Sequence, residues 1–407
     1  METVSGAQQR ILAGIVSTPV ERVPLRQARG RVLARPVIST REIPALDNSA
    51  MDGYAVIAAD LASASDADPV ELAVLGESRA GTVPTQRVTA GTAIRIMTGA
   101  PMPGGADSVV RHEDTDNGRE RVRVRTAVLP GRDVRRAGED MRPGDEILEP
   151  GRRLRSFDLA ASAALGLVEL AVHRRPRVAV LSTGDELVEP EQPPGPGQVP
   201  DSNRVAVIAA VEEAGGVPVD LGIARDRPED LREKLERALE CDIIVSTAGV
   251  SVGDHDHVRD VVEELGRIDL WQVAMRPGRP IAVGNVAGVL FLGLPGNPVS
   301  SQVTFELFAR PAIRALEGAA EVHRRRLAAR ALVAMSKPEG LETFHRGRLV
   351  AEAESSPESD GLPGVVLTGP QGSGILRSLV LADCLVALPA TGCGVAAGVT
   401  VEVLPLG

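Results

Sequence analysis

The run from Pro44 to Tyr54 has the composition of a functional site and not of a structural strand. It places small, polar and acidic residues, including Asp47 and Asp52, where a core strand would have apolar ones, and Tyr54 is the only tyrosine of the chain. Asp and Asn also bond their own backbone readily, so a plain turn-forming loop is the alternative interpretation. The concentration of unusual residues favours a functional site.

Three further motifs combine glycine with hydroxyl or amide side chains. They occupy residues 182–186, 246–254 and 294–298, and each follows a short apolar run. Glycines let backbone N–H groups approach a phosphate, and a helix that starts at Pro298 offers an anion-binding N-terminus. None of the three is a P-loop or a G-x-G-x-x-G fingerprint. One such motif alone could be a tight turn, but three together predict a site for a phosphorylated ligand.

Charged residues lie in or beside the same loops. Glu186, Asp226, Asp254 and Asp256 are hard oxygen donors of the kind that holds Mg²⁺ between protein and substrate phosphate, although Asp256 could instead cap a helix. Arg276 and Arg279 flank Pro277-Gly278 on a stiff loop, which suits a tetrahedral oxyanion. A solvated basic turn is the alternative for this pair.

Alternating strands and helices would position these loops. Apolar runs at 178–181, 217–223 and 243–245 predict buried parallel strands, and 204–214, 229–240 and 256–265 predict the helices between them. Further strands are expected at 271–274, 281–283 and 289–292, and a long helix from Pro298 toward Leu316. This is a doubly wound α/β domain, whose ligands bind at the carboxyl ends of the strands. All three motifs then lie on one edge of the sheet.

The rest of the chain has a different texture. Residues 7–43 have helical spacing, and residues 55–135 have the pattern of an all-β region. A helix is expected over 156–167. Because helical segments lie on both sides of the β region, a β domain inserted into a discontinuous domain is predicted. From about 325 to 407, Gly and Pro punctuation predicts a small β barrel or sandwich. The predicted domains are 1–43 with 138–172 (discontinuous and elongated), 44–137 (inserted β), 173–322 (α/β) and 323–407 (C-terminal β barrel).

Composition excludes several classes of protein. A net charge of −10 disfavours nucleic acid and anionic membrane as partners. The three cysteines lack C-x-x-C spacing, which argues against a disulfide framework or a zinc site and for a reducing compartment. No signal pattern or membrane-length apolar run is present, so a soluble cytoplasmic protein is expected.

Taken as a set, the motifs resemble one family over nearly the whole chain and in order. They are Asp47–Tyr54, Arg95–Pro101, Gly138-Glu139-Asp140, Ser182–Leu187, Asp201-Ser202-Asn203, Gly249–Asp254, Pro277-Gly278 and Gly293–Pro298. The family is molybdopterin molybdenumtransferase, or MoeA, to which the E domain of gephyrin also belongs. The resemblance implies a homodimer of elongated protomers, each with a discontinuous first domain, an inserted β domain, a molybdopterin-binding α/β domain and a C-terminal barrel.

The resemblance also implies a reaction. Members of the family take adenylylated molybdopterin, split off AMP in a Mg²⁺-dependent step and insert molybdate into the dithiolene; a molybdopterin adenylyltransferase would supply the substrate. By resemblance, Glu186, Asp226 and Asp256 would be catalytic, with Asp226 and Asp256 near the metal, and Asp52 and Asp140 would come from the partner subunit. The residues expected to bind the pterin and its phosphates are Thr98, Ser182, Thr183, Gly184, Asp185, Gly249, Ser251, Gly253, Pro295, Asn297 and Pro298.

Molybdate is expected to be bound by cationic side chains and a hydroxyl group. By resemblance these are Arg276, Arg279, Arg346 and Ser373. The family usually has lysines where this chain has Arg276 and Arg279, which keeps the charge but changes the geometry, because Arg is a planar fork and Lys a point charge. Ala248 replaces a glycine that the family generally carries.

Two other functions stay open from the sequence. The α/β part alone resembles the adenylyltransferase that makes the substrate, although the Asp47–Tyr54 run argues against that enzyme. The family also includes non-catalytic or moonlighting scaffolds of the gephyrin type, and the carboxylates present here favour retained chemistry. Molybdate and tungstate differ little in size and charge, so the sequence does not choose between them.

Overall fold

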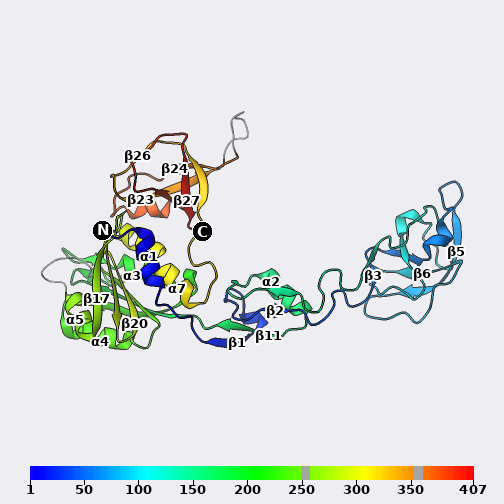
Figure 1. Cartoon of the computed structure of the whole chain (residues 1–407), viewed down its shortest axis with the longest axis horizontal. Coiled ribbons are helices and arrows are strands. Elements are labelled where there is room, and N and C mark those ends of the chain that lie inside the picture. The colour runs from blue at the N-terminus through cyan, green and yellow to red at the C-terminus, as the bar shows by residue number, and fades with distance from the viewer. Residues whose placement is uncertain (249–256, 352–360) are drawn as a thin grey trace. The chain divides into compact units, whose positions relative to one another are not determined.

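The computed structural model describes residues 1–248, 257–351 and 361–407. The chain divides into two compact units (Figure 1). The larger unit contains residues 1–34, 150–154 and 170–407, and the smaller unit contains 35–149 and 155–169. The chain therefore passes between the units more than once, as a discontinuous arrangement requires. The boundaries of the four predicted domains stay a prediction.

The smaller unit is built on a five-stranded sheet. Its order is β7 (Ser108–Arg111), β4 (Gly53–Val56), β6 (Thr92–Ile96), β5 (Val70–Ser78) and β8 (Arg121–Val124). Tyr54 is fully buried in its core, and the Tyr54 hydroxyl donates to the Gly118 carbonyl at 2.9 Å. The same unit holds β2 (Val37–Ile38) paired with β10 (Glu146–Leu148), β3 (Asn48–Ser49) paired with β9 (Val134–Arg135), and α2 (Ser156–Ala164). The prediction that residues 55–135 form an all-β region is confirmed.

The larger unit contains a six-stranded α/β sheet. Its order is β15 (Val217–Ala224), β12 (Arg177–Thr183), β16 (Ile243–Thr247), β20 (Val289–Leu294), β19 (Pro280–Val286) and β17 (Gly266–Gln272). The first four strands are parallel, as the sequence predicts. β19 runs antiparallel to β20, because the two strands are joined by a two-residue turn that permits only a hairpin. β17 is antiparallel to β19 and therefore runs in the same direction as the first four strands. The strand expected at 271–274 is displaced: β17 ends at Gln272.

Helices cover both faces of this sheet. They are α3 (Ser202–Ala214), α4 (Pro228–Ala238) and α5 (His257–Leu265), together with α1 (Val4–Leu12) and the helical segment from Pro298 to Leu316. Alternate residues of each central strand belong to different cores: Val178 and Val180 face one, Ala179 and Leu181 the other. Burial on both faces explains why these strands are continuous apolar runs.

The helix expected from Pro298 to Leu316 is continuous but not uniform. It consists of α6 (Pro298–Thr304), a π-helical turn η4 (Phe305–Ala309) and α7 (Arg310–Leu316). Pro311 has no N–H to donate to the carbonyl of Leu307, four residues earlier. The side chain of Gln8 donates to that carbonyl instead, at 2.9 Å. Proline chemistry therefore changes the helix locally without ending it.

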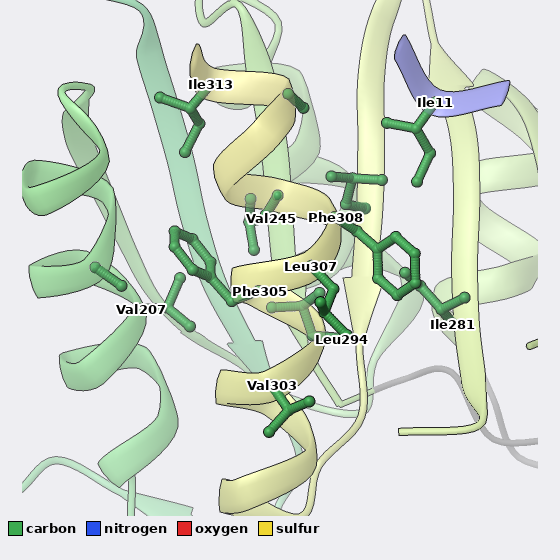
Figure 2. Packing of buried hydrophobic residues seen from close by; sticks show 14 of the residues in the cluster. Ile11, Val207, Val245, Ile281, Leu294, Val303, Phe305, Leu307, Phe308 and Ile313 are labelled. Atoms are coloured by element: carbon green, nitrogen blue, oxygen red, sulfur yellow. The ribbon is translucent and has the colours of Figure 1, made fainter. Parts of the chain in front are cut away.

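Figure 2 shows the apolar core around this helical segment. Phe305 and Phe308 are fully or almost fully buried, between Val207 of α3, Val245 of β16, Ile281 of β19 and Ile11 of α1. Burial of each large side chain stabilises the fold by about 1.5–3 kcal/mol. This core fixes the N-terminal end of α6, where one of the motifs lies.

The C-terminal part of the larger unit is a closed barrel. The strands run in the order β18 (Met275–Arg276), β23 (Glu342–Val350), β24 (Gly364–Leu367), β21 (Leu327–Ala331), β27 (Thr400–Pro405) and β25 (Cys384–Leu388). Pairing of β23 with β25 closes five of them, so the barrel alternative holds and the sandwich does not. A short helix, α8 (Leu376–Val380), follows β24. Within the described residues no helix has the length and apolarity needed to cross a membrane.

Candidate active site

Three neighbouring parallel strands end together at one edge of the α/β sheet. Ser182 of β12 lies opposite Thr247 of β16, and Thr247 lies opposite Leu294 of β20. The hydroxyls of Ser182 and Thr247 are 2.6 Å apart and buried. Asp226 follows β15, the fourth parallel strand. The predicted convergence of the motifs on one edge is therefore present in the described residues, although Ser182 and Thr183 are buried and hold the edge together rather than face solvent.

Glu186 lies close to the backbone of Gly184. A Cβ atom at Gly184 would be 2.4 Å from Oε2 of Glu186, and Gly184 has a φ of +142°. The positive φ favours glycine here, because a residue with a Cβ would be strained in this backbone conformation. The exposed Asp185 accepts a hydrogen bond from the Asp226 amide at 3.2 Å. The loop after β12, which carries Glu186, is therefore in contact with the loop after β15, which carries Asp226. We call these two acidic loops the acidic corner.

This corner has the donor chemistry that Mg²⁺ prefers. In proteins Mg²⁺ is usually held by one or two carboxylates plus substrate phosphate. Glu186 and Asp226 provide two exposed carboxylates, and no group of three or more potential metal ligands occurs among residues 1–248, 257–351 and 361–407. The residues present fit a magnesium ion shared with a ligand phosphate, and not a site built from protein ligands alone. Asp256, the other predicted metal residue, lies outside the described residues, as do Gly249, Ser251 and Gly253.

The third motif is tied to its neighbours on two sides. The side chain of Asn203 in α3 donates to the carbonyl of Gly296 at 2.7 Å. The Val299 amide, in the first turn of α6, donates to the carbonyl of Ser373 at 3.0 Å. Asn297 precedes α6, and Pro298 occupies its first turn. The motif at 294–298 therefore connects the α/β sheet with the C-terminal barrel.

Two adjoining cavities lie where that sheet meets the barrel. The first has a volume of about 500 Å³, and its lining includes Arg276, Lys337, His345 and Arg346. The second, of about 420 Å³, is lined by Arg276, Arg279, Asn297 and Ser373 among others. All four residues predicted to bind molybdate thus line one or both cavities. No Asp or Glu is among the lining residues of either.

Strand pairing explains why these arginines meet. Arg276 is in β18, which pairs in parallel with the start of β23, and Arg276 lies opposite Thr343. Arg346 is three residues further along β23. The side chain of Arg346 is almost fully buried, donating from Nε to the Ser378 hydroxyl at 3.1 Å and from Nη2 to the Gly372 carbonyl at 3.0 Å.

The environment of Arg346 is short of negative charge. Burial, and then the positive charge of Arg276, lower the pKa of Arg346 to about 10. A buried cation facing a second cation is stabilised by an anion placed between them. The cavities therefore have the electrostatic character of an oxyanion site.

The smaller unit holds the other predicted site residues. Thr98 donates to Asp52, and the two are exposed. The Asp140 amide donates to the Ile43 carbonyl at 3.0 Å, and the Asp47 carboxylate accepts from the Ala137 amide at 2.8 Å. Asp47 thereby connects the two loops that carry Asp52 and Asp140.

Comparison with known proteins covers the whole chain. Residues 2–166 match the MoeA N-terminal region (domain I and II), 179–315 the "Probable molybdopterin binding domain", and 328–406 the MoeA C-terminal region (domain IV). A Mycobacterium tuberculosis protein named molybdopterin molybdenumtransferase 2 is 38% identical, over 98% of both chains. A Haemophilus influenzae molybdopterin molybdenumtransferase is 35% identical, over 100% of this chain and 98% of its own.

The chain belongs to the MoeA family. A solved structure of the molybdopterin biosynthesis MoeA protein from Pyrococcus horikoshii OT3 agrees with the fold: the TM-score is 0.83 at 30% identity, and 100% of each chain is covered. The predicted family and multidomain fold class are confirmed. Which residues act in the site stays a prediction.

The structure of this MoeA chain adds cavity residues that the sequence did not single out. Lys337 and His345 line the first cavity, and Gln371 lines both. Gln371 accepts from the Arg346 amide at 2.8 Å and donates to the Arg346 carbonyl at 3.2 Å, so it fixes the backbone that carries Arg346. In the sequence, the motif Gln371-Gly372-Ser373-Gly374 was the signal that could have identified Gln371 as a site residue. Lys337 donates to three backbone carbonyls, a pattern without a signal in the sequence.

Proposed function

We propose that this protein inserts molybdate into adenylylated molybdopterin and releases AMP in a Mg²⁺-dependent step of molybdenum cofactor biosynthesis. The observation that carries the proposal is the pair of cation-lined cavities around Arg276 and Arg346. Asn297 of the motif after β20 lines the second cavity, and the loops that bear Glu186 and Asp226 follow β12 and β15 of the same sheet. One region of the larger unit thus offers an oxyanion site and a phosphate-and-metal site. Membership of the MoeA family, over the whole chain, supports this reaction over that of the shorter adenylyltransferase-like enzymes.

The chain's own residues divide the work between these regions. Backbone amides of the loops after β12 and β20 would hold the pterin phosphate, with Asn297 and Pro298 at the start of α6. Glu186 and Asp226 would hold Mg²⁺, which supplies charge neutralisation on the phosphate oxygens when it is bound. One of these carboxylates would orient a water and take its proton as the water attacks a phosphorus atom of the anhydride. The anhydride P–O bond would break, AMP would leave, and the other phosphate would stay on the molybdopterin.

Molybdate would be held by the second region. Arg276, Arg279 and Arg346 provide charge, and Ser373 provides a hydroxyl. The sulfur ligands come from the pterin, so the reaction needs no protein thiol. The oxyanion could be molybdate or tungstate, and competition between the two in the same assay distinguishes them.

We further propose a homodimer in which Asp52 and Asp140 of the partner subunit complete the site. Both residues lie on loops of the smaller unit that are connected through Asp47. A molybdopterin adenylyltransferase would supply the substrate, and the cytoplasm would be the compartment, since the three cysteines are free and widely spaced. Analytical ultracentrifugation tests the dimer, and mixing two inactive variants, Asp52→Asn and Asp226→Asn, tests sharing of the site through recovered activity.

The first experiment is AMP release from adenylylated molybdopterin by the purified protein, with Mg²⁺ and with or without molybdate. Asp226→Asn should abolish release, and Glu229→Gln, an exposed carboxylate three residues away in the first turn of α4, is the matched control. Molybdate-stimulated release that is lost only in Asp226→Asn supports the transferase. A folded protein that binds the pterin but releases no AMP overturns it and favours a scaffold.

A further inference from the structure

Arg204 connects three carboxylates that come from three different parts of the α/β domain. It lies in the first turn of α3 and is 4% exposed. Its Nε donates to Asp201 at 2.9 Å, its Nη1 to both oxygens of Asp220 at 2.5 and 2.6 Å, and its Nη2 to Glu189. No other side chain type offers five donors in a rigid fork, so arginine suits this position.

Two of the three carboxylates belong to the fixed frame of the domain. Asp201 is 1% exposed and caps α3 by accepting from the Arg204 amide at 3.1 Å. Asp220 is in β15 and also accepts from the Gly222 amide at 2.8 Å. Burial would lower the pKa of Arg204, but hydrogen bonds and charge from Asp220 and Asp201 raise it overall. Arg204 is therefore a charged fixed point.

The third carboxylate, Glu189, belongs to the segment that carries Glu186. Within this segment, residues 184–200, β13 (Leu187–Val188) pairs with β14 (Val199–Pro200). The Val199 amide donates to the Glu186 carbonyl, and the Asp201 amide to the Val188 carbonyl, both at 2.9 Å. On the other side, Nη1 of Arg225 donates to the Leu187 carbonyl at 3.0 Å. Side chains of Arg204 and Arg225 thus hold the segment from two directions.

We propose that Arg204 is a positioning residue for Glu186. Through Glu189 it holds the 184–200 segment so that the Glu186 carboxylate lies over Gly184, at the edge where the strands end. The next residue back, Asn203, holds Gly296 of the third motif. The first turn of α3 therefore aligns two loops of the site. This inference rests on the proposed function, in which Glu186 takes part in AMP release.

Glu189→Gln tests the inference without disturbing the other two partners of Arg204. The substitution removes the charge of a side chain that is 40% exposed and leaves Asp201 and Asp220 in place. We expect AMP release to fall about tenfold, the usual effect of weakening one charged hydrogen bond, with little change in melting temperature. Glu191→Gln, an exposed residue of the same segment, is the matched control and should release AMP at the wild-type rate.

A double-mutant comparison separates positioning from general destabilisation. If Glu189 acts through Glu186, then Glu189→Gln adds no further loss to a Glu186→Gln protein. Independent, multiplicative losses, or an equal loss in Glu191→Gln, would overturn the inference.

Hydrogen exchange at the Val199 and Asp201 amides gives a readout that does not depend on the reaction. Exchange should be faster in Glu189→Gln than in the wild type, because these two amides hold the segment closed. A wild-type protein that releases no AMP contradicts the proposed function alone. Unchanged exchange contradicts the role of Arg204 alone.

Discussion

Asp52 and Thr98 form a double hydrogen bond. One carboxylate oxygen of Asp52 accepts from the Thr98 amide at 2.6 Å and from the Thr98 hydroxyl at 2.8 Å. These two donors are the main reason that the pKa of Asp52 is lowered, with smaller effects from His112 and Arg95. The two donors therefore favour the ionised form of the carboxylate and fix its orientation on a loop of the smaller unit.

Thr98→Val should raise the pKa of Asp52 toward its usual value. The hydroxyl donor is lost while the amide donor stays, so the shift is partial. Because the folded-state pKa is lowered, any stability from this pair is present above the unfolded-state pKa and is lost as the pH falls through the folded one. NMR titration of the Asp52 carboxyl carbon measures the shift. Thr85→Val, at an exposed loop position of the same unit, should leave it unchanged.

Ala248→Gly should stabilise the protein. Ala248 has a φ of +73°, in the left-handed region that favours glycine. Relief of about 1–2 kcal/mol of strain is partly offset by about 0.4–1 kcal/mol from the freer unfolded chain, for a net gain of about 0.5–1 kcal/mol.

Urea denaturation of Ala248→Gly measures this gain. Ala287→Gly, at the other alanine with positive φ, should behave alike, and Ala209→Gly in the exposed face of α3 should instead cost about 1 kcal/mol. A loss of stability in Ala248→Gly would show that the left-handed backbone carries no strain.

Arg276→Gln should weaken molybdate binding by about tenfold or more. Arg276 lines both cavities, and the variant would lose the charge-assisted hydrogen bond that Arg276 is expected to donate to the bound anion. Isothermal titration with molybdate at fixed ionic strength measures the effect. Arg377→Gln removes one positive charge from an exposed position of the short helix α8 and is the control for general electrostatics. Equal weakening in both variants would mean that the cavity arginine is not a direct contact.

Only one of the three cysteines should react with a thiol reagent in the folded protein. Burial raises the pKa of the Cys241 thiol. Burial, and to a smaller extent the charge of Asp383, raises the pKa of the Cys384 thiol to about 12. Both stay protonated at neutral pH, whereas Cys393 is exposed. Titration with a chromogenic disulfide at pH 8 should detect one thiol, and three in denaturant. A second fast thiol in the folded protein would contradict this.

Local sequence patterns were sufficient for the α/β sheet and its edge. The apolar runs at 178–181 and 243–245 are buried on both faces, and the residues that follow them necessarily emerge at one edge because parallel strands end together. The same patterns gave the helix start at Pro298 and the end of α3 at Gly215, which has a φ of +108°. These features depend on the periodicity and backbone preferences of neighbouring residues, so each of them can be predicted from its own short segment of sequence.

Tertiary structure alone decided which distant side chains meet. Arg276 and Arg346 are 70 positions apart, and they line one cavity because β18 pairs with β23 and β25 closes the barrel. Arg204 collects Glu189, Asp201 and Asp220 because β15 packs beside α3 and the 184–200 segment folds back. Gln8 replaces the hydrogen bond that Pro311 removes. Apart from the local Asp201–Arg204 pair, each contact depends on strand register and packing across the whole unit, which no short stretch of sequence encodes.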